Sequence, residues 1–341
     1  MLLRCRALHL CAVMLAIALL PAVVSSQTSA GQQSQPQQQT AASAAKASQL
    51  MFSVVDAKGL FVTTLRAEDV RVLEDGQPQQ ILNFERRADQ PLSFALMLDT
   101  SVSQENAIPN AKRAALNFVD SIMRPGKDAG CVITFTGVAK LENQLTSDRE
   151  RVRRAIEGIK FEPPQGYITG GLIIRGAPPA KSDLMRAGST AIWDALWVAV
   201  DEALAKTPST TRRAIILLTD GVDTSSRRKL SEAIERAIQA QVAVYTIGIG
   251  DTMRGGIDAE PLRKVAERTG GRLFLPRTFD DLPAVLVEIE QALRSQYSVS
   301  YLSTSKKGEG RMRKIKIEIV NPELRRQRLQ LSHPQGYFPQ G

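Results

Sequence analysis

Four short apolar runs that contain no charged residue constrain the fold more than any other feature. They cover residues 92–98, 131–135, 214–219 and 242–249, and most of the segments between them have helical periodicity. Uncharged runs of this length that alternate with helices are typical of strands buried on both faces of a parallel sheet. The sequence therefore predicts an α/β domain over 91–294, with a doubly wound, mainly parallel sheet flanked by helices.

The segments between these runs complete the predicted domain. Trp193 and Trp197 lie in an apolar pattern at helical spacing, so we expect both indole rings to anchor the core rather than to bind a cofactor. The predicted helices cover 106–123, 149–158, 190–206, 230–240, 260–268 and 279–294, an edge strand covers 139–145, and a short strand covers 272–275.

Both flanks of this domain have the alternating pattern of β-strands. Strands are predicted at 50–55, 60–62, 69–74 and 79–84 before the domain and at 297–301, 314–319 and 329–331 after it, with a hairpin turn at Asp75-Gly76. Neither flank is large enough to bury a core alone. We therefore predict one small β-sandwich built from 49–90 and 295–341, into which the α/β domain is inserted.

The first residues have the parts of a secretory signal. Residues 1–26 contain a basic start with Arg4 and Arg6, an apolar stretch and a small-residue cleavage site. An uncleaved membrane anchor is the alternative, because the apolar stretch approaches the roughly 17–20 residues that span a bilayer. Residues 27–48 are almost wholly Gln, Ser, Ala and Thr, which predicts a flexible linker. We expect a secreted, periplasmic or cell-envelope protein, with membrane contact only through a retained anchor.

Charge and cysteine content narrow the classes of function. The formal charge is +9, or +7 without residues 1–26, so the chain could attract anionic partners. No basic motif interleaved with aromatic residues is present, and we expect no nucleic-acid binding. Cys131 is the single cysteine after residue 26, which excludes a disulfide scaffold. Because it lies in an apolar run, we expect a buried core thiol.

Oxygen-bearing side chains gather where the first apolar run ends. Asp99, Ser101 and Ser103 alternate, so an extended backbone would present one carboxylate and two hydroxyls on the same side. Such a set suits a hard cation such as Mg²⁺. Thr190, just before a predicted helix, and Asp220, at the end of the third run, could converge on the same ion, because strands of a parallel sheet end at one edge. The alternative is that the serines only cap the next helix and the acids are solvated turn residues.

Taken together, these motifs resemble the von Willebrand factor type A (VWA) domain and its metal-ion-dependent adhesion site (MIDAS). The family pattern is Asp-x-Ser-x-Ser, a later Thr, and Thr-Asp-Gly, and it is present here at Asp99–Ser103, Thr190 and 219–221. The flanks resemble the secreted bacterial branch of VWA-related proteins. The resemblance covers about two hundred residues.

The resemblance implies a role for each residue. Ser101 and Ser103 would bind the ion directly, Thr190 would join them in a ligand-competent state, and Asp99 and Asp220 would act mainly through water. The ion would be Mg²⁺, or Mn²⁺ or Ca²⁺. With few direct carboxylates the ion keeps much of its charge, and an Asp or Glu of a protein partner could complete the site.

Some positions depart from the family pattern or surround the site. Val102 stands where Gly is frequent, and Gln104 where Met is frequent; neither change removes a ligand. Asp223 is expected to lie outside the ligand set. A long insertion at 158–189 leads into Thr190, where it could shape partner choice or be a non-functional excursion. The basic run 227–229 could steer an acidic partner or simply begin a solvated helix.

Three classes of function follow from this reading. The first is a binding module, not an enzyme, that uses the ion to engage an acidic partner. The second is a phosphatase with an aspartyl nucleophile at Asp99, which is disfavoured because Ser101 stands where the second acid is needed. Ser-His-Asp catalysis lacks a suitable histidine, since His333 is the only one after residue 26. The third is a scaffold whose β-sandwich makes the contacts while the metal stabilises the fold.

Overall fold

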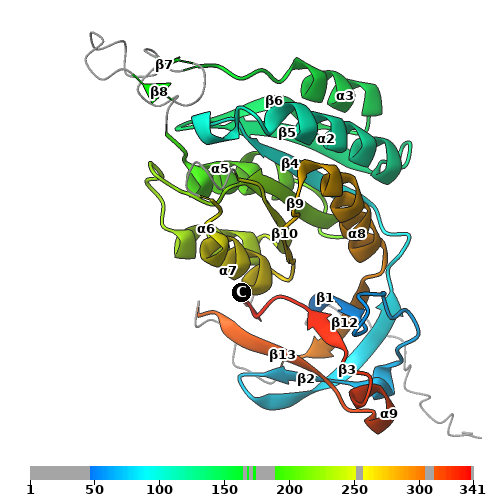
Figure 1. Ribbon diagram of the computed structural model, residues 1–341. Helices are drawn as coiled ribbons and strands as arrows, with labels where there is room; N and C mark the ends of the chain where they lie inside the picture. Colours follow the sequence, from blue (N-terminus) through cyan, green and yellow to red (C-terminus); the bar gives the residue numbers. More distant parts are fainter. Residues whose placement is uncertain are drawn as a thin grey trace, which may run out of the picture. The chain divides into compact units, whose positions relative to one another are not determined.

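The computed structural model describes residues 47–163, 167–168, 172–173, 189–250, 256–303 and 311–338 (Figure 1), all within one compact unit that spans Ser43–Gly341. The predicted signal sequence, nearly all of the predicted linker and most of the predicted insertion lie outside the described residues. Within the described part of the chain, no helix is both long enough and apolar enough to cross a membrane.

A six-stranded mixed sheet forms the centre of the α/β domain (Figure 1). Its strand order is β11-β10-β9-β4-β5-β6, and every neighbouring pair is parallel except β5 and β6, so the predicted edge strand closes the sheet in the antiparallel sense. The doubly wound, mainly parallel sheet is therefore confirmed. The strands are β4 (Leu92–Asp99), β5 (Ala129–Phe135), β6 (Ala139–Thr146), β9 (Arg212–Thr219), β10 (Val242–Gly248) and β11 (Leu273–Phe274).

Helices cover both faces of this sheet. All eight residues of strand β4 are buried, so both faces of the sheet must be covered. Successive side chains enter different cores: Leu96 belongs to one apolar cluster, and Ala95 and Met97 belong to the other. Helices α2 (Ile108–Ile122), α3 (Arg149–Gly158) and α8 (Leu282–Arg294) pack in the first cluster, and α5 (Ile192–Val198), α6 (Leu230–Gln239) and α7 (Ala259–Thr269) in the second.

The helix predicted over 190–206 differs from the observed one in two ways. The observed helix begins later, at Ile192, and its second half (Ala199–Leu204) has π-helical hydrogen bonding. The prediction that both tryptophans anchor the core is correct for Trp193, which is 6% exposed. It is wrong for Trp197, which is only partly buried. Its ring lies under the Arg228 guanidinium, 3.5 Å from the ring centroid, and not inside the core.

The strands of the two flanks pair in one antiparallel sheet of seven strands, as Figure 1 shows below the α/β domain. The order is β14-β1-β12-β3-β2-β13-β15. Because β3 and β12 are neighbours, the whole α/β domain lies in the sequence between two paired strands. The strands are β1 (Ala47–Val55), β2 (Val70–Glu74), β3 (Gln77–Arg86), β12 (Tyr297–Leu302), β13 (Arg313–Ile319), β14 (Gln330–Ser332) and β15 (Gly336–Tyr337), and a short helix α9 (Pro322–Arg325) precedes β14.

Local turn chemistry explains the hairpin between β2 and β3. Asp75 and Gly76 both have positive φ, +48° and +83°, as the predicted two-residue turn requires, and Glu74 pairs with Gln77 across it. The strand predicted at 60–62 is absent from the described structure. That segment makes a single β-bridge, between Phe61 and Val55.

This sheet curls on itself. A flat sheet of seven strands would separate its edges by roughly 29 Å, at about 4.8 Å per strand spacing. Edge strands β14 and β15 are nevertheless joined by only residues 333–335, which reach roughly 14 Å when extended. The inward side chains, Phe52, Val72 and Tyr301 among them, form one buried cluster. The predicted two-layer sandwich is therefore not confirmed: the flanks do pair, but in one continuous curled sheet.

Candidate metal centre

The five predicted site residues lie at the carboxyl edge of the six-stranded sheet. Asp99 ends β4, and Ser101 and Ser103 follow it. Asp220 follows β9, which pairs with β4 in parallel and in register up to Leu98 and Leu218. From β4 the chain adds β5 and β6 on one side and then β9, β10 and β11 on the other, so the strand order switches between β4 and β9, which is where α/β sheets of this kind bind ligands.

Backbone hydrogen bonds hold Thr190 at the same edge of the sheet. Its carbonyl oxygen accepts hydrogen bonds from the amides of Thr224, at 2.8 Å, and Ser225, at 3.0 Å, in the loop after β9. The next amide, of Ala191, donates to Thr136 O just after β5, at 2.7 Å. Thr190 is thus held between the loops that follow β5 and β9. Within the described residues, no hydrogen bond joins it to the other four.

The two serine hydroxyls have a spacing that fits a single ion. Ser101 Oγ and Ser103 Oγ lie 3.1 Å apart. Neighbouring ligands of an octahedral Mg²⁺, at about 2.1 Å from the ion, lie about 3 Å from each other. Both hydroxyls could therefore contact one cation without moving far.

The geometry disfavours the helix-cap alternative. Ser101 precedes a short 3₁₀ turn (Val102–Gln104), but its side chain makes no capping hydrogen bond there. Helix α2 begins four residues after that turn, at Ile108, with Ala107 as its N-cap. The two acids are not solvated turn residues either, since Asp99 is 5% and Asp220 4% exposed.

Asp99 is held by its own loop and by the neighbouring strand. Its Oδ1 accepts from the Ser101 amide at 2.9 Å, and its Oδ2 accepts from the Thr219 hydroxyl at 2.5 Å. Burial raises the pKa of Asp99 to about 7, and the nearby Asp220 carboxylate adds to this, although the hydrogen bonds from Ser101 and Thr219 act in the opposite direction. Two buried acids that repel each other are an environment that a bound cation would relieve.

Asp220 is positioned by a residue to which the sequence analysis assigned no role. Gln104, 3% exposed, donates through Nε2 to Asp220 Oδ2 and to Ile249 O, both at 3.0 Å. The other oxygen, Oδ1, accepts from the Val222 amide at 3.0 Å. Gln104 was identified as a departure from the family pattern, but its partners are 116 and 145 residues away, so the sequence offered no signal for this contact.

Thr219 is the second functional residue that was not predicted. It precedes Asp220 directly, and its hydroxyl carries the 2.5 Å contact to Asp99. The Thr-Asp-Gly motif was a signal for it. Gly221 in the same motif has φ +84°, and a Cβ there would lie 2.3 Å from Asp258 O, so the motif needs glycine at this position.

Asp223 accepts hydrogen bonds at the start of α5. Its Oδ1 accepts from the Ile192 amide at 2.8 Å and from the Ser226 hydroxyl at 2.6 Å. These bonds fix the start of α5 at Ile192, and they leave Thr190 in the loop. In the basic run, the exposed Arg228 guanidinium stacks on Trp197, which fixes its position but leaves its positive charge in place.

The donor set fits a hard divalent ion bound mainly by hydroxyls. Among the described residues, no group of three His, Cys, Asp or Glu side chains converges in a way that could hold a metal. Two buried acids and two hydroxyls 3.1 Å apart are instead a set of oxygen donors only. Oxygen donors select Mg²⁺, Mn²⁺ or Ca²⁺ over softer metals.

The fold and this site define a class of protein: an α/β domain with a doubly wound sheet and an oxygen-lined centre at the strand switch. Residues 181–288 match the family described as the von Willebrand factor type A domain. This match confirms the predicted resemblance to the VWA domain; it includes Thr190 and Asp220, whereas Asp99, Ser101 and Ser103 lie outside the matched residues.

Two relatives match over more than half of the chain. The bovine (Bos taurus) calcium-activated chloride channel regulator 1 is 30% identical over 181 residues, which cover 52% of this chain and 17% of that protein. A UPF0353 protein of Nocardia farcinica (strain IFM 10152) is 26% identical over 231 residues, covering 59% of this chain and 63% of that protein. The chain thus spans less than two thirds of the length of either relative.

Solved structures are similar at the level of the fold. Proximal thread matrix protein 1 from the mussel byssus is 20% identical, with a TM-score of 0.49 over 66% of this chain and 51% of that one. A further structure of that mussel protein has a zinc-occupied MIDAS motif. A von Willebrand factor type A protein from Catenulispora acidiphila is 14% identical, with a TM-score of 0.47 over 86% of this chain and 72% of that one.

Proposed function

We propose that the chain is a non-enzymatic binding module whose MIDAS holds a divalent cation and uses it to engage an acidic side chain of a protein partner. One observation carries the proposal: Ser101 Oγ and Ser103 Oγ lie 3.1 Å apart, beside two buried carboxylates at the strand switch of a VWA domain. VWA domains with such a site bind divalent metals. We assign Mg²⁺ here, with Mn²⁺ and Ca²⁺ as alternatives.

The proposed roles follow from what each side chain can offer. Ser101 and Ser103 would contact the ion directly, and Thr190 would join them when a partner is bound. Asp99 and Asp220 would hold the ion's water ligands, because all four of their oxygens already accept a hydrogen bond from the protein. An ion with few direct carboxylates attracts an external one strongly, since a charge-assisted contact forms when a partner's Asp or Glu replaces water.

The same set of residues disfavours catalysis. A phosphatase that uses Asp99 as its nucleophile needs a second acid two residues on, and Ser101 stands there. His333 belongs to the flanking sheet, where its Nε2 accepts from the Ile317 amide at 3.4 Å and its Nδ1 lies 2.9 Å from Pro334 O. His333 is therefore not placed to act as a general base at this site.

We further propose that the protein acts outside the cytoplasm, in the periplasm, the cell envelope or the medium. The support is the signal-like sequence at residues 1–26. The partner is then an envelope or extracellular protein with an exposed Asp or Glu. No nucleic-acid role is proposed.

Two measurements test this function. The first is calorimetric titration of the EDTA-treated protein with Mg²⁺ and Mn²⁺, for which we expect one site that is lost in Asp99→Ala and in Asp220→Ala. The matched control is Asp280→Ala, an exposed acid outside the site, which should bind metal normally.

The second measurement is capture of partners from cell-envelope extract with and without EDTA. Capture that needs the metal and fails in Asp99→Ala supports a metal-dependent contact. Metal binding with capture that survives both EDTA and mutation of Thr190 would instead assign the contacts to the flanking sheet. Absence of any divalent-ion site in the wild-type protein would refute the proposal.

A further inference from the structure

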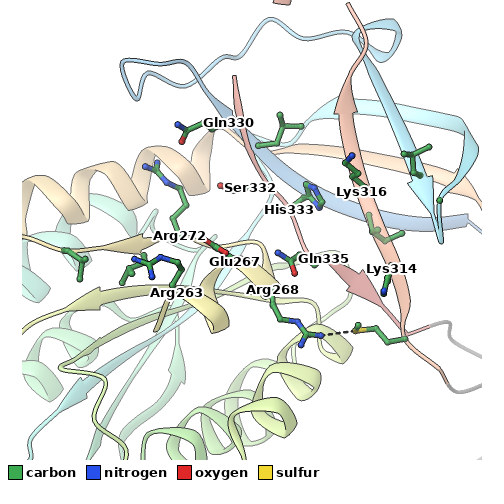
Figure 2. A pocket seen from close by; sticks show the side chains of 18 residues that line it. Arg263, Glu267, Arg268, Arg272, Lys314, Lys316, Gln330, Ser332, His333 and Gln335 are labelled. Atoms are coloured by element: carbon green, nitrogen blue, oxygen red, sulfur yellow. Dashed lines mark hydrogen bonds between the residues drawn. The ribbon is translucent and has the colours of Figure 1, made fainter. Parts of the chain in front are cut away.

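A large cleft of mixed polar and apolar lining lies where the C-terminal half of α7 and strand β11 face strands β13 and β14 (Figure 2). Its volume is about 1180 Å³. Its charged lining residues are Arg263, Arg268, Arg272, Lys314, Lys316 and Glu267, so five cations face a single acid. None of the five predicted metal-site residues lines it.

The cations are divided between the two sides of the cleft. Figure 2 shows Arg263, Arg268 and Arg272 on the side of the α/β domain, and Lys314 and Lys316 on strand β13 opposite them. His333 and Gln335, which follow β14, are drawn between the two groups. A ligand in the cleft would therefore meet positive charge from both sides.

Three of these cations already have an acidic partner. Arg263 pairs with Glu260 at 3.1 Å, Arg272 with Glu288 at 2.8 Å and Lys316 with Glu318 at 2.8 Å. The Arg263 and Lys316 side chains are exposed, and such surface pairs hold them only weakly, whereas the Arg272 pair is mostly buried.

Arg268 and Lys314 differ from the other three. In the described part of the chain neither forms an ion pair, and the side-chain contact seen for Arg268 is from Nη2 to Met312 Sδ, at 3.8 Å. Arg268 is partly buried and Lys314 is exposed. The strongest uncompensated positive charge in the cleft therefore comes from one guanidinium and one ammonium group on opposite sides.

The remaining lining residues limit what can bind. No Phe, Tyr or Trp side chain lines the cleft, so the His333 ring is the one aromatic surface among the lining residues on which a nucleic-acid base could stack. Strand β11 is only two residues long, Leu273–Phe274, which is too short to recruit a peptide by strand addition. The cleft thus offers charge, polar side chains, apolar side chains such as Leu275 and Met312, and room for more than one small anion.

We propose that this cleft binds a ligand that carries two or more linked tetrahedral oxyanions, phosphate or sulfate. One such group would pair with Arg268, whose planar guanidinium offers two parallel N–H donors to an oxyanion. A second group would pair with Lys314 across the cleft. This site is independent of the metal centre, and it needs no divalent ion.

The test is titration of the full-length protein in EDTA with tripolyphosphate, sucrose octasulfate, orthophosphate and a hexaglutamate peptide. We expect tripolyphosphate or sucrose octasulfate to bind with a 1:1 stoichiometry, and to bind more weakly as salt increases. Which of the two binds more tightly identifies the source of the oxyanion. The affinity should be unchanged in Asp99→Ala, which separates this site from the metal centre.

The decisive variant is the double substitution Arg268→Gln with Lys314→Gln, which should weaken binding by at least about tenfold, because two charge-assisted contacts are lost. The matched control is Lys58→Gln with Arg151→Gln, which removes the same charges from exposed positions outside the cleft and should bind like the wild type. Lys314→Glu, at an exposed position, provides a second variant if the double variant is unstable.

Three results would overturn the proposal. The first is that neither polyanion binds. The second is equal loss of affinity in the cleft variant and in its control, which would assign binding to net charge alone. The third is hexaglutamate or orthophosphate binding as tightly as the linked oxyanions, which would make the cleft a site for acidic peptides or for single anions.

Discussion

Replacing Gln104 by Leu should destabilise the metal-free protein strongly, although the residue is neither a predicted ligand nor a core apolar side chain. Its Nε2 donates to Asp220 Oδ2 and to Ile249 O, each at 3.0 Å, and its side chain is buried. Leucine has a similar size but no donor. The substitution therefore leaves a buried carboxylate oxygen and a buried carbonyl oxygen without this partner.

The expected loss can be worked from these two contacts. A buried acceptor that loses its donor costs about 1–3 kcal/mol, with the charged acceptor at the upper end. Part of this cost is offset, because leucine has no polar amide that must be desolvated on folding. The net loss in the free energy of unfolding is therefore about 3 kcal/mol. For a chain of 341 residues the loss corresponds to a decrease in Tm of roughly 4–5 °C.

Thermal unfolding in EDTA, followed by circular dichroism, measures this effect. The control is Gln239→Leu, the same substitution at an exposed position of α6, which should shift Tm by no more than roughly 2 °C. A second arm uses Gln104→Glu, which keeps the shape but adds a third buried carboxylate near Asp220. That group's folded pKa should be raised, so this variant should lose stability as pH rises from 5 to 8. Equal Tm values for Gln104→Leu and the Gln239→Leu control would refute the reasoning.

Two further predictions concern the opposite end and the middle of the sheet. Asp128 is fully buried and accepts from both Arg124 and Arg294, so Asp128→Ala should cost at least about 3 kcal/mol in urea denaturation. Burial raises its pKa, but those hydrogen bonds outweigh burial and hold it well below the ordinary value of 3.8. Wild-type stability should therefore fall as pH falls below about 4, and a flat profile from pH 6 to 3 would contradict this. Burial raises the pKa of Cys131 to about 12, so iodoacetamide at pH 8 should leave Cys131 of the folded protein unmodified, as judged by peptide mass spectrometry.

The strands and the location of the site were predictable because both depend on local pattern and on one topological rule. An uncharged run such as 92–98 can only be stable when both of its faces are covered, and β4 is buried throughout. Once Asp99 and Asp220 are placed at the ends of parallel strands, the edge of the sheet brings them together whatever the loops do. Ser101 and Ser103 do lie together, but the extended backbone assumed from their alternation is wrong, because Val102–Gln104 forms a 3₁₀ turn that brings the two hydroxyls within 3.1 Å.

The features that were mispredicted depend on contacts between distant residues. The start of α5 is set by Asp223, 31 residues away, and periodicity alone extended the helix back to Thr190. Trp197 has the spacing of a core residue, yet Arg228 covers it. The curl of the flanking sheet follows from the three residues that join its two edges, and strand patterns contain no information on which edges meet.

The hydrogen bonds around the two acids bear directly on how the site would use a metal. An oxygen that already accepts an N–H or O–H hydrogen bond gives less electron density to an ion, and this holds for all four carboxylate oxygens of Asp99 and Asp220. The Ser101 and Ser103 hydroxyls, in contrast, are neutral and can contact the ion without compensating its charge. A cation held in this way is fixed in place by the protein but only partly neutralised by it. The residual positive charge would be greatest on the open side of the ion, where a carboxylate of another molecule is the complementary group.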